Sequence, residues 1–114
     1  MKSKRGEVAN LGDAILTEIA ERLVRVYHPE RIYLFGSMAR GDAGPDSDYD
    51  ILLIVDDETA PENFNLRRAY DALWGIRTSA DIHIWSRKRF DSRLHLKASL
   101  PATIMREGKL LYAA

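Results

Sequence analysis

The chain has 114 residues, with 17 basic side chains, 17 acidic side chains, a formal net charge of zero and no cysteine. The lack of cysteine excludes disulfides and thiolate metal sites and fits a cytoplasmic protein, while the balanced charge argues against nucleic-acid binding driven by counterion release. No stretch approaches the roughly 20 apolar residues of a membrane span, so we expect one soluble domain over residues 1–114 with no membrane partner.

The first third of the chain predicts a helix, a strand and a short helical turn. Apolar residues at helical spacing predict a helix from Leu11 to His28, with Asn10 as its N-cap and Pro29 as its stop. The β-forming run "RIYLFG" at 31–36 predicts a strand that ends at a glycine. The segment "SMAR" then predicts one helical turn, and "GDAGPDS" is typical of a loop.

The rest of the chain predicts two more strands and further helices. The run "DYDILLIV" at 48–55 is almost continuously apolar after its aspartates, which indicates a strand buried on both faces. Thr59 and Glu62 resemble a capping box, so we expect a helix from there to Ile76. The remaining predicted elements are a strand at 80–86, a helical segment at 87–97, a helix from Ser99 to Gly108 and an edge strand, "KLLYA", after it. This order predicts an α/β (α+β) fold, a small mixed sheet flanked by helices.

Charge is distributed unevenly along the chain. Residues 41–66 contain eight carboxylates and no lysine or arginine, whereas residues 87–109 contain seven basic residues against Asp91 and Glu107. One interpretation is two solvated surfaces of opposite sign. The other is an acidic patch that binds cations beside a basic flank that binds phosphate or an acidic partner.

Two aspartates at the start of the buried strand are the strongest sign of chemistry. Side chains two residues apart in a strand point the same way, so Asp48 and Asp50 would face one side together. Their hard oxygen ligands suit Mg²⁺ or Mn²⁺, and a pair of bound ions fits phosphoryl chemistry. Asp81, at the start of the next strand with His83 on its face, would supply a third carboxylate that activates an attacking hydroxyl.

The turn after the first strand predicts a phosphate site. Gly36 lets a phosphate approach the backbone, and the amides that open the "SMAR" turn, with the Ser37 hydroxyl, can hold anionic oxygens. Arg40, one turn further on, would add a guanidinium. The sequence therefore predicts a phosphate cradle beside a metal site.

Each of these residues also has a structural interpretation. Asp48 and Asp50 could be turn residues, Asp81 could cap its strand, and Arg40 could pair with Asp42. A calcium-binding EF-hand loop is excluded, because Ile51 and Asp57 stand where the loop needs glycine and glutamate. Packing is the favoured interpretation of the large aromatic residues, and a hydrogen-bonded structural role that of His83. The aromatic residues are Phe64, Tyr70, Trp74 and Trp85, and Tyr49 is expected in the core with Ile51.

The stretch "GSMARGDAGPDSDYD" resembles the signature of the DNA polymerase β-like nucleotidyltransferases: glycine, serine, ten residues, then Asp-x-Asp. The later "ADIHIW" resembles the strand with the family's third acid. The fuller pattern looks most like the minimal nucleotidyltransferase (MNT) antitoxins of HEPN/MNT toxin–antitoxin modules. The resemblance covers residues 31–86, the expected catalytic core, and extends loosely to "REGKLLY" in the segment 87–114.

The resemblance implies a polymerase β-like nucleotidyltransferase fold, two Mg²⁺ ions and a nucleoside triphosphate, ATP, as substrate. It also implies that AMP is transferred to a tyrosine of a partner HEPN ribonuclease, and that this modification silences the ribonuclease. Because only residues 87–114 follow the core, we expect a partner or a second subunit to supply the acceptor, in a hetero-oligomer or a homodimer. Two alternatives stay open, namely an antitoxin that acts by binding alone and a transferase for small molecules such as aminoglycosides.

Overall fold

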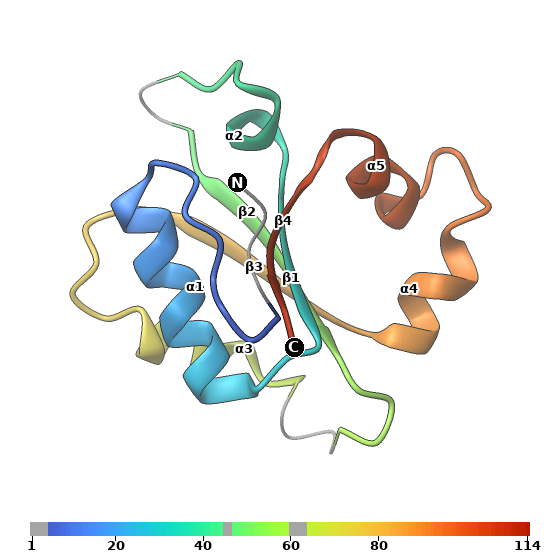
Figure 1. Cartoon of the computed structure of the whole chain (residues 1–114), viewed down its shortest axis with the longest axis horizontal. Helices are drawn as coiled ribbons and strands as arrows, with labels where there is room; N and C mark the ends of the chain where they lie inside the picture. Colours follow the sequence, from blue (N-terminus) through green and yellow to red (C-terminus); the bar gives the residue numbers. More distant parts are fainter. Residues whose placement is uncertain (1–4, 45–46, 60–63) are drawn as a thin grey trace.

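A four-stranded mixed sheet lies at the centre of the computed structural model, which describes residues 5–44, 47–59 and 64–114 (Figure 1). The strands, in spatial order, are β3 (Ala80–Ser86), β2 (Tyr49–Val55), β1 (Arg31–Phe35) and β4 (Lys109–Ala113). Strand β1 pairs antiparallel with both β2 and β4, whereas β2 and β3 are parallel. The predicted strands at 31–36, 48–55 and 80–86 and the edge strand are therefore present.

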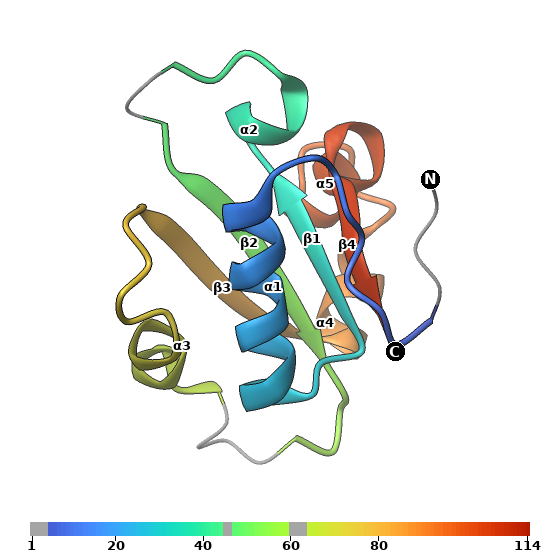
Figure 2. The same ribbon diagram turned by 60° about the vertical axis from the view of Figure 1, so that its left-hand side comes forward.

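Helices cover both faces of this sheet (Figures 1 and 2). Helices α1 (Ala14–Tyr27) and α3 (Leu66–Ala72) lie on one face, and α4 (Arg87–Arg93) and α5 (Leu100–Glu107) lie on the other. The short helix α2 (Ser37–Arg40) stands at the end of β1, as the "SMAR" pattern predicted. The predicted fold class, a small mixed sheet flanked by helices, is confirmed. Within the described ranges, no helix has both the length and the apolar character to cross a membrane.

Strand β2 contributes to two cores, one on each face of the sheet. Ile51 and Leu53 pack in the core beneath α1, and Leu52 and Ile54 pack on the other side with Phe90 of α4. All four β2 side chains are fully buried, and each contributes about 1.5–3 kcal/mol through the hydrophobic effect. This confirms the prediction of a strand buried on both faces.

The start of the first helix was predicted wrongly. Helix α1 begins at Ala14, and its N-cap is Asp13, whose Oδ1 accepts the Leu16 N–H at 3.1 Å. Asn10 instead accepts the Gly12 N–H in a local turn. Gly12 has φ +81, a left-handed conformation that ends any helix reaching back to Leu11. At the other end Pro29 follows the helix, as predicted.

Two later helices are shorter than their patterns suggested. The N–H of Thr59 donates to Asp56 O in a turn, and Glu62, its expected capping partner, lies outside the described residues. Helix α3 begins at Leu66, with Asn65 as N-cap, and ends at Ala72 rather than Ile76. Gly75, at φ +89, excludes continuation. Likewise α4 ends at Arg93, before the predicted end at residue 97.

A buried tyrosine joins β2 to the start of α1. The Tyr49 hydroxyl donates to Asp13 Oδ2 at 2.6 Å, while the other oxygen of that carboxylate caps the helix. Tyr49 is only 7% exposed, and burial, followed by the hydrogen bond and the charge of Asp13, raises its pKa to about 12. One carboxylate thus fixes both the helix start and the strand segment between Asp48 and Asp50.

We predict that Tyr49→Phe lowers the free energy of unfolding by about 1–2 kcal/mol, because it removes a charge-assisted hydrogen bond and leaves a carboxylate oxygen without its donor. Chemical denaturation with urea measures this loss. Tyr112→Phe is the matched control, because Tyr112 is equally buried and its hydroxyl makes no hydrogen bond within the described part of the chain. Equal losses in the two variants would contradict the prediction.

Candidate active site

The pairing of three strands places the predicted site residues in one row. Asp50 of β2 lies opposite Asp81 in the parallel register with β3, and opposite Phe35 in the antiparallel register with β1. Gly36 follows Phe35 directly and leads into α2 (Figure 2). The structure therefore brings together Gly36, Asp50 and Asp81, with Asp48 one residue before β2. Asp50 and Asp81 lie on the sheet face that α4 and α5 cover further along.

Asp50 is the electrostatic centre of this row. Its pKa is raised, first by burial and then by the neighbouring negative charges of Asp81 and Asp48, while His83 and Arg40 act in the opposite direction. Ionised carboxylates at this spacing repel one another. A cation bound between these carboxylates would remove that repulsion, so the arrangement is electrostatically suited to a metal ion.

Gly36 makes room for the Asp50 carboxylate. The glycine has φ +73 and ψ −160, a conformation that residues with a Cβ avoid. A Cβ added there would overlap Asp50 Oδ2 and lie 3.1 Å from its Cγ. From the sequence, Gly36 was expected to let a phosphate approach the backbone. The structure shows a second reason for a glycine here, its close contact with a carboxylate, which the sequence spacing did not reveal.

Helix α2 has the features expected of a phosphate site, although its arginine is already paired. Ser37 and Met38 open the helix, so their amides have no partner within it. The Arg40 guanidinium pairs through Nε with Asp42 Oδ2 at 3.1 Å and through Nη1 with Glu107 Oε2 at 3.6 Å. The alternative interpretation of Arg40, a pair with Asp42, is therefore what the structure shows. Because these pairs are exposed, exchanging them for a phosphate would cost little.

His83 lies beside the third carboxylate. Its Nε2 is 3.5 Å from Asp81 Oδ2, and its ring packs against Phe35 with centroids 5.6 Å apart. Both Asp81 and His83 remain accessible, with side chains 58% and 38% exposed. The edge strand β3 thus presents an acid and an imidazole to solvent next to Asp50.

The carboxylates suit a hard metal ion that is shared with a substrate. Among the residues that the structure describes, no three His, Cys, Asp or Glu side chains form a group that would hold a metal on their own. Mg²⁺ is usually held by one or two carboxylates together with substrate phosphates and water. Asp48 and Asp50, the second of which contacts the glycine that precedes α2, fit that mode of binding.

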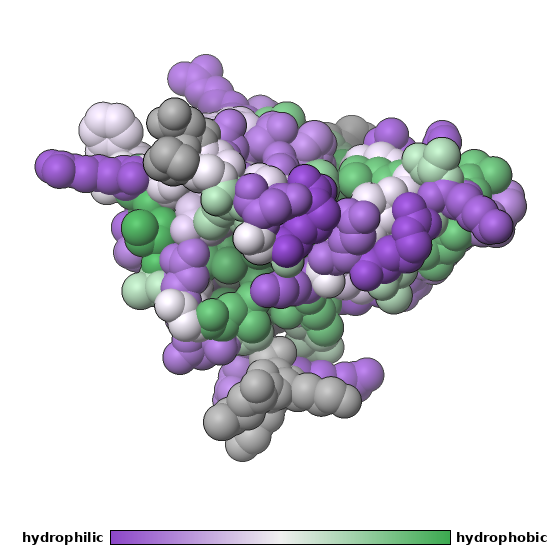
Figure 3. All heavy atoms as spheres, turned by 90° about the horizontal axis from the view of Figure 1, so that it is seen from above, coloured by the Kyte–Doolittle hydropathy of each residue, from purple (hydrophilic) through white to green (hydrophobic). Residues whose placement is uncertain are grey.

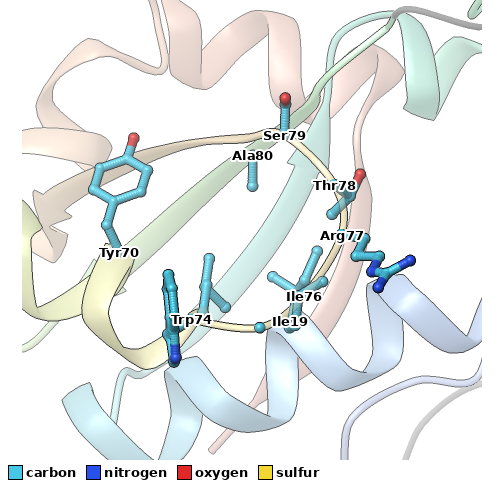
Figure 4. Close-up of a pocket in the computed structure, with 10 residues that line it drawn as sticks. Ile19, Tyr70, Trp74, Ile76, Arg77, Thr78, Ser79 and Ala80 are labelled. Atoms are coloured by element: carbon cyan, nitrogen blue, oxygen red, sulfur yellow. The ribbon is translucent and has the colours of Figure 1, made fainter.

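A hollow on the side of the sheet that α1 covers is lined by none of these carboxylates (Figure 4). It encloses about 800 Å³ between α1, the end of α3 and the loop before β3, with Ile19, Tyr70 and Ile76 in its wall. Ala80 belongs to this hollow and neighbours Asp81 in β3, so the two side chains point to opposite faces. Trp74 at its rim is 85% exposed, so the expected packing role of Trp74 was wrong.

The outer surface near α2 is mixed in character. Seen from above, hydrophilic side chains run across the centre of this end of the molecule, and hydrophobic ones lie on either side (Figure 3).

Trp85, the other tryptophan, is half-buried and packs against the core beneath α4 and α5, as expected.

The sheet topology, with acidic residues and a Gly-Ser turn at one end of it, defines the class: a small α/β nucleotidyltransferase domain. Residues 16–109 match the family model described as a nucleotidyltransferase domain, and the chain belongs to this family. No curated protein matches the chain.

Solved structures share the fold. A proposed nucleotidyltransferase from Sulfolobus solfataricus is 27% identical, with a TM-score of 0.52 over 68% of this chain and 69% of that one. A toxin–antitoxin structure with AMP-PNP is 23% identical, with a TM-score of 0.56 over 84% and 72% of the two chains. A mutant of the toxin–antitoxin MntA-HpeT is 19% identical, with a TM-score of 0.53 over 83% and 71%.

We predict that Gly36→Ala displaces the Asp50 carboxylate and weakens Mg²⁺-dependent nucleotide binding at least ~10-fold, because the new methyl group and Oδ2 cannot occupy the same space. Calorimetric titration with Mg²⁺ and AMP-PNP measures the change. Gly44→Ala is the control, since nothing lies within 4 Å of a Cβ there and no left-handed φ is involved. Equal binding by both variants would show that Asp50 needs no such space.

We also predict that Asp50→Asn raises the melting temperature near neutral pH. A carboxyl whose pKa is raised in the folded state costs stability once it ionises, so the gain from Asn is absent below the ordinary Asp pKa of about 3.9 and appears as pH rises through the raised pKa. Solvent screening keeps the gain small, about 1–3 °C. Thermal unfolding from pH 4 to 8 measures it, and a variant that melts below the wild type throughout would refute the sign.

Proposed function

We propose that this protein is a Mg²⁺-dependent nucleotidyltransferase that transfers AMP from ATP to a tyrosine hydroxyl of a partner protein. The partner would be a HEPN-type ribonuclease toxin, which the transfer neutralises. The observation that supports this proposal most is the pairing of Asp50 with Asp81 on β3 and with Phe35 on β1, which brings the next residue, Gly36, into contact with Asp50. It unites the phosphate-binding turn with the carboxylates in a chain of the nucleotidyltransferase family.

In this mechanism the triphosphate lies against the start of α2. The amides of Ser37 and Met38 and the Ser37 hydroxyl bind phosphate oxygens, and Arg40 adds its charge after leaving Asp42 and Glu107. Asp48 and Asp50, with Asp81, would hold Mg²⁺, or Mn²⁺ in its place, which neutralises charge on the triphosphate and makes the acceptor hydroxyl more acidic.

In the proposed reaction, Asp81 acts on the acceptor. The tyrosine oxygen forms a bond to the α-phosphorus as the bond to the bridging oxygen breaks, and pyrophosphate leaves with the electron pair. The phenolic proton passes to the exposed Asp81 carboxylate. His83, 3.5 Å from that carboxylate, orients it.

The similar structures support the partner class. Two of them are toxin–antitoxin proteins, one with the ATP analogue AMP-PNP and one a mutant with two aspartates, two positions apart, replaced by glutamate. Asp48 and Asp50 have that same spacing. These parallels favour a toxin partner, an ATP-like substrate and a functional role for the aspartate pair.

A second candidate is an antitoxin that occludes its partner without chemistry. The exposed Trp74 and half-exposed Tyr70 at the rim of the 800 Å³ hollow favour it, because exposed aromatic side chains are typical anchors of protein interfaces. In cells, full neutralisation of the toxin by the Asp48→Asn, Asp50→Asn double variant would favour binding over catalysis.

We predict that the protein labels the product of its neighbouring gene when incubated with α-labelled ATP and Mg²⁺, and that intact mass spectrometry shows added AMP on that partner. The double variant Asp48→Asn, Asp50→Asn should lower the rate more than ~100-fold, since even partners outside the ligand shell are worth about 10–100-fold. No label on a folded partner from the wild-type protein would count against transfer.

A further inference from the structure

The basic helix α4 lies on the same side of the molecule as the carboxylates. Asp81, His83 and Trp85 occupy every second position of β3, so they share one face of the sheet. Trp85 lies four residues beyond Asp81, about 13 Å along the strand. The Arg89 guanidinium of α4 stacks over the Trp85 ring, 3.8 Å from its centroid. A path of exposed and half-exposed side chains therefore runs from Asp81 to α4.

The strand order determines from which side an acceptor approaches. Helix α2 follows β1, Asp50 is on the central strand β2, and Asp81 is on β3, where the sheet ends. In phosphoryl-group transfer the attacking and leaving oxygens lie roughly in line on opposite sides of the phosphorus. With the leaving phosphates at α2, the acceptor must come from the β3 side. That side has no further strand over it in the described sheet.

The charges on α4 indicate what approaches there. Lys88, Arg89 and Arg93 are exposed and form no ion pair within the described residues, and Asp91 is the single acid on this helix. Arg87 is excluded from the set, because it pairs with Glu30 at 3.0 Å and with Asp57 at 3.8 Å. Three such cations suit the docking of an acidic protein segment. They suit RNA less well, because three phosphate contacts would bind RNA only weakly at physiological salt.

We propose that the acceptor belongs to an acidic protein segment that lies over His83 and Trp85 and pairs with Lys88, Arg89 and Arg93. This inference rests on the proposed function. An acidic side chain of the partner meets Arg89 roughly 13 Å from the acceptor hydroxyl, four positions away in an extended segment. The basic face of α4 thereby selects the acceptor, while α2 and the carboxylates bind the nucleotide.

The test uses Arg89→Glu in the full chain, with the neighbouring gene's product as acceptor. We expect the acceptor KM to rise at least ~10-fold, because a favourable charge pair becomes a repulsive one. Mg²⁺-dependent AMP-PNP binding, measured by calorimetry, should stay within about twofold of wild type. Arg67→Glu is the matched control, since Arg67 is 85% exposed on α3, on the other face of the sheet.

A second variant guards against misfolding. Lys88→Glu with Arg93→Glu leaves the stacking of Arg89 on Trp85 intact and should also raise the acceptor KM. Unchanged acceptor KM in both variants, with transfer by wild type intact, overturns the docking proposal alone. Absence of any transfer by wild type overturns the proposed function and this inference with it. Label that is removed by ribonuclease but not by protease also overturns the proposal, because the acceptor is then RNA.

Discussion

The site depends on one constraint, the hydrogen-bonded register of β1, β2 and β3. Phe35, Asp50 and Asp81 lie side by side across these strands, and a shift of one residue would turn Asp50 from its present face to the opposite one. The buried residues that follow, Ile51 to Ile54, prevent such a shift because each must stay in its own core. The same apolar packing that stabilises the fold therefore holds the carboxylates together.

This arrangement has a cost in stability. Burial and neighbouring charge raise the pKa of Asp50, and Gly36 adopts a left-handed conformation to leave space for it. Neither feature strengthens the fold. Functional sites are the places where such strain is retained, and the compensation lies nearby, in the fully buried remainder of β2 and in the Tyr49–Asp13 hydrogen bond.

Much of the fold followed from the sequence because strands and short motifs depend on local pattern. The period-two alternation of residues 80–86 predicted β3, and the apolar run after Asp50 predicted β2. The spacing of Asp48 and Asp50 predicted that these two side chains point the same way. The N-cap could not be predicted, since Asn10 and Asp13 are both good caps and the choice depends on Tyr49, distant in sequence. The contact of Gly36 with Asp50 and the exposure of Trp74 were missed for the same reason: both depend on tertiary structure.

The parallel pairing of β2 with β3 has a consequence for the order of folding. Residues 36–48 join the antiparallel strands β1 and β2, whereas the longer segment 56–79, which includes α3, separates β2 from its parallel partner β3. Such distant contacts form slowly, because the entropy of closing a long loop must be overcome first. A nascent chain thus acquires its glycine turn and first aspartates early and its third carboxylate later, so the acidic row is complete only once β3 has joined β1 and β2.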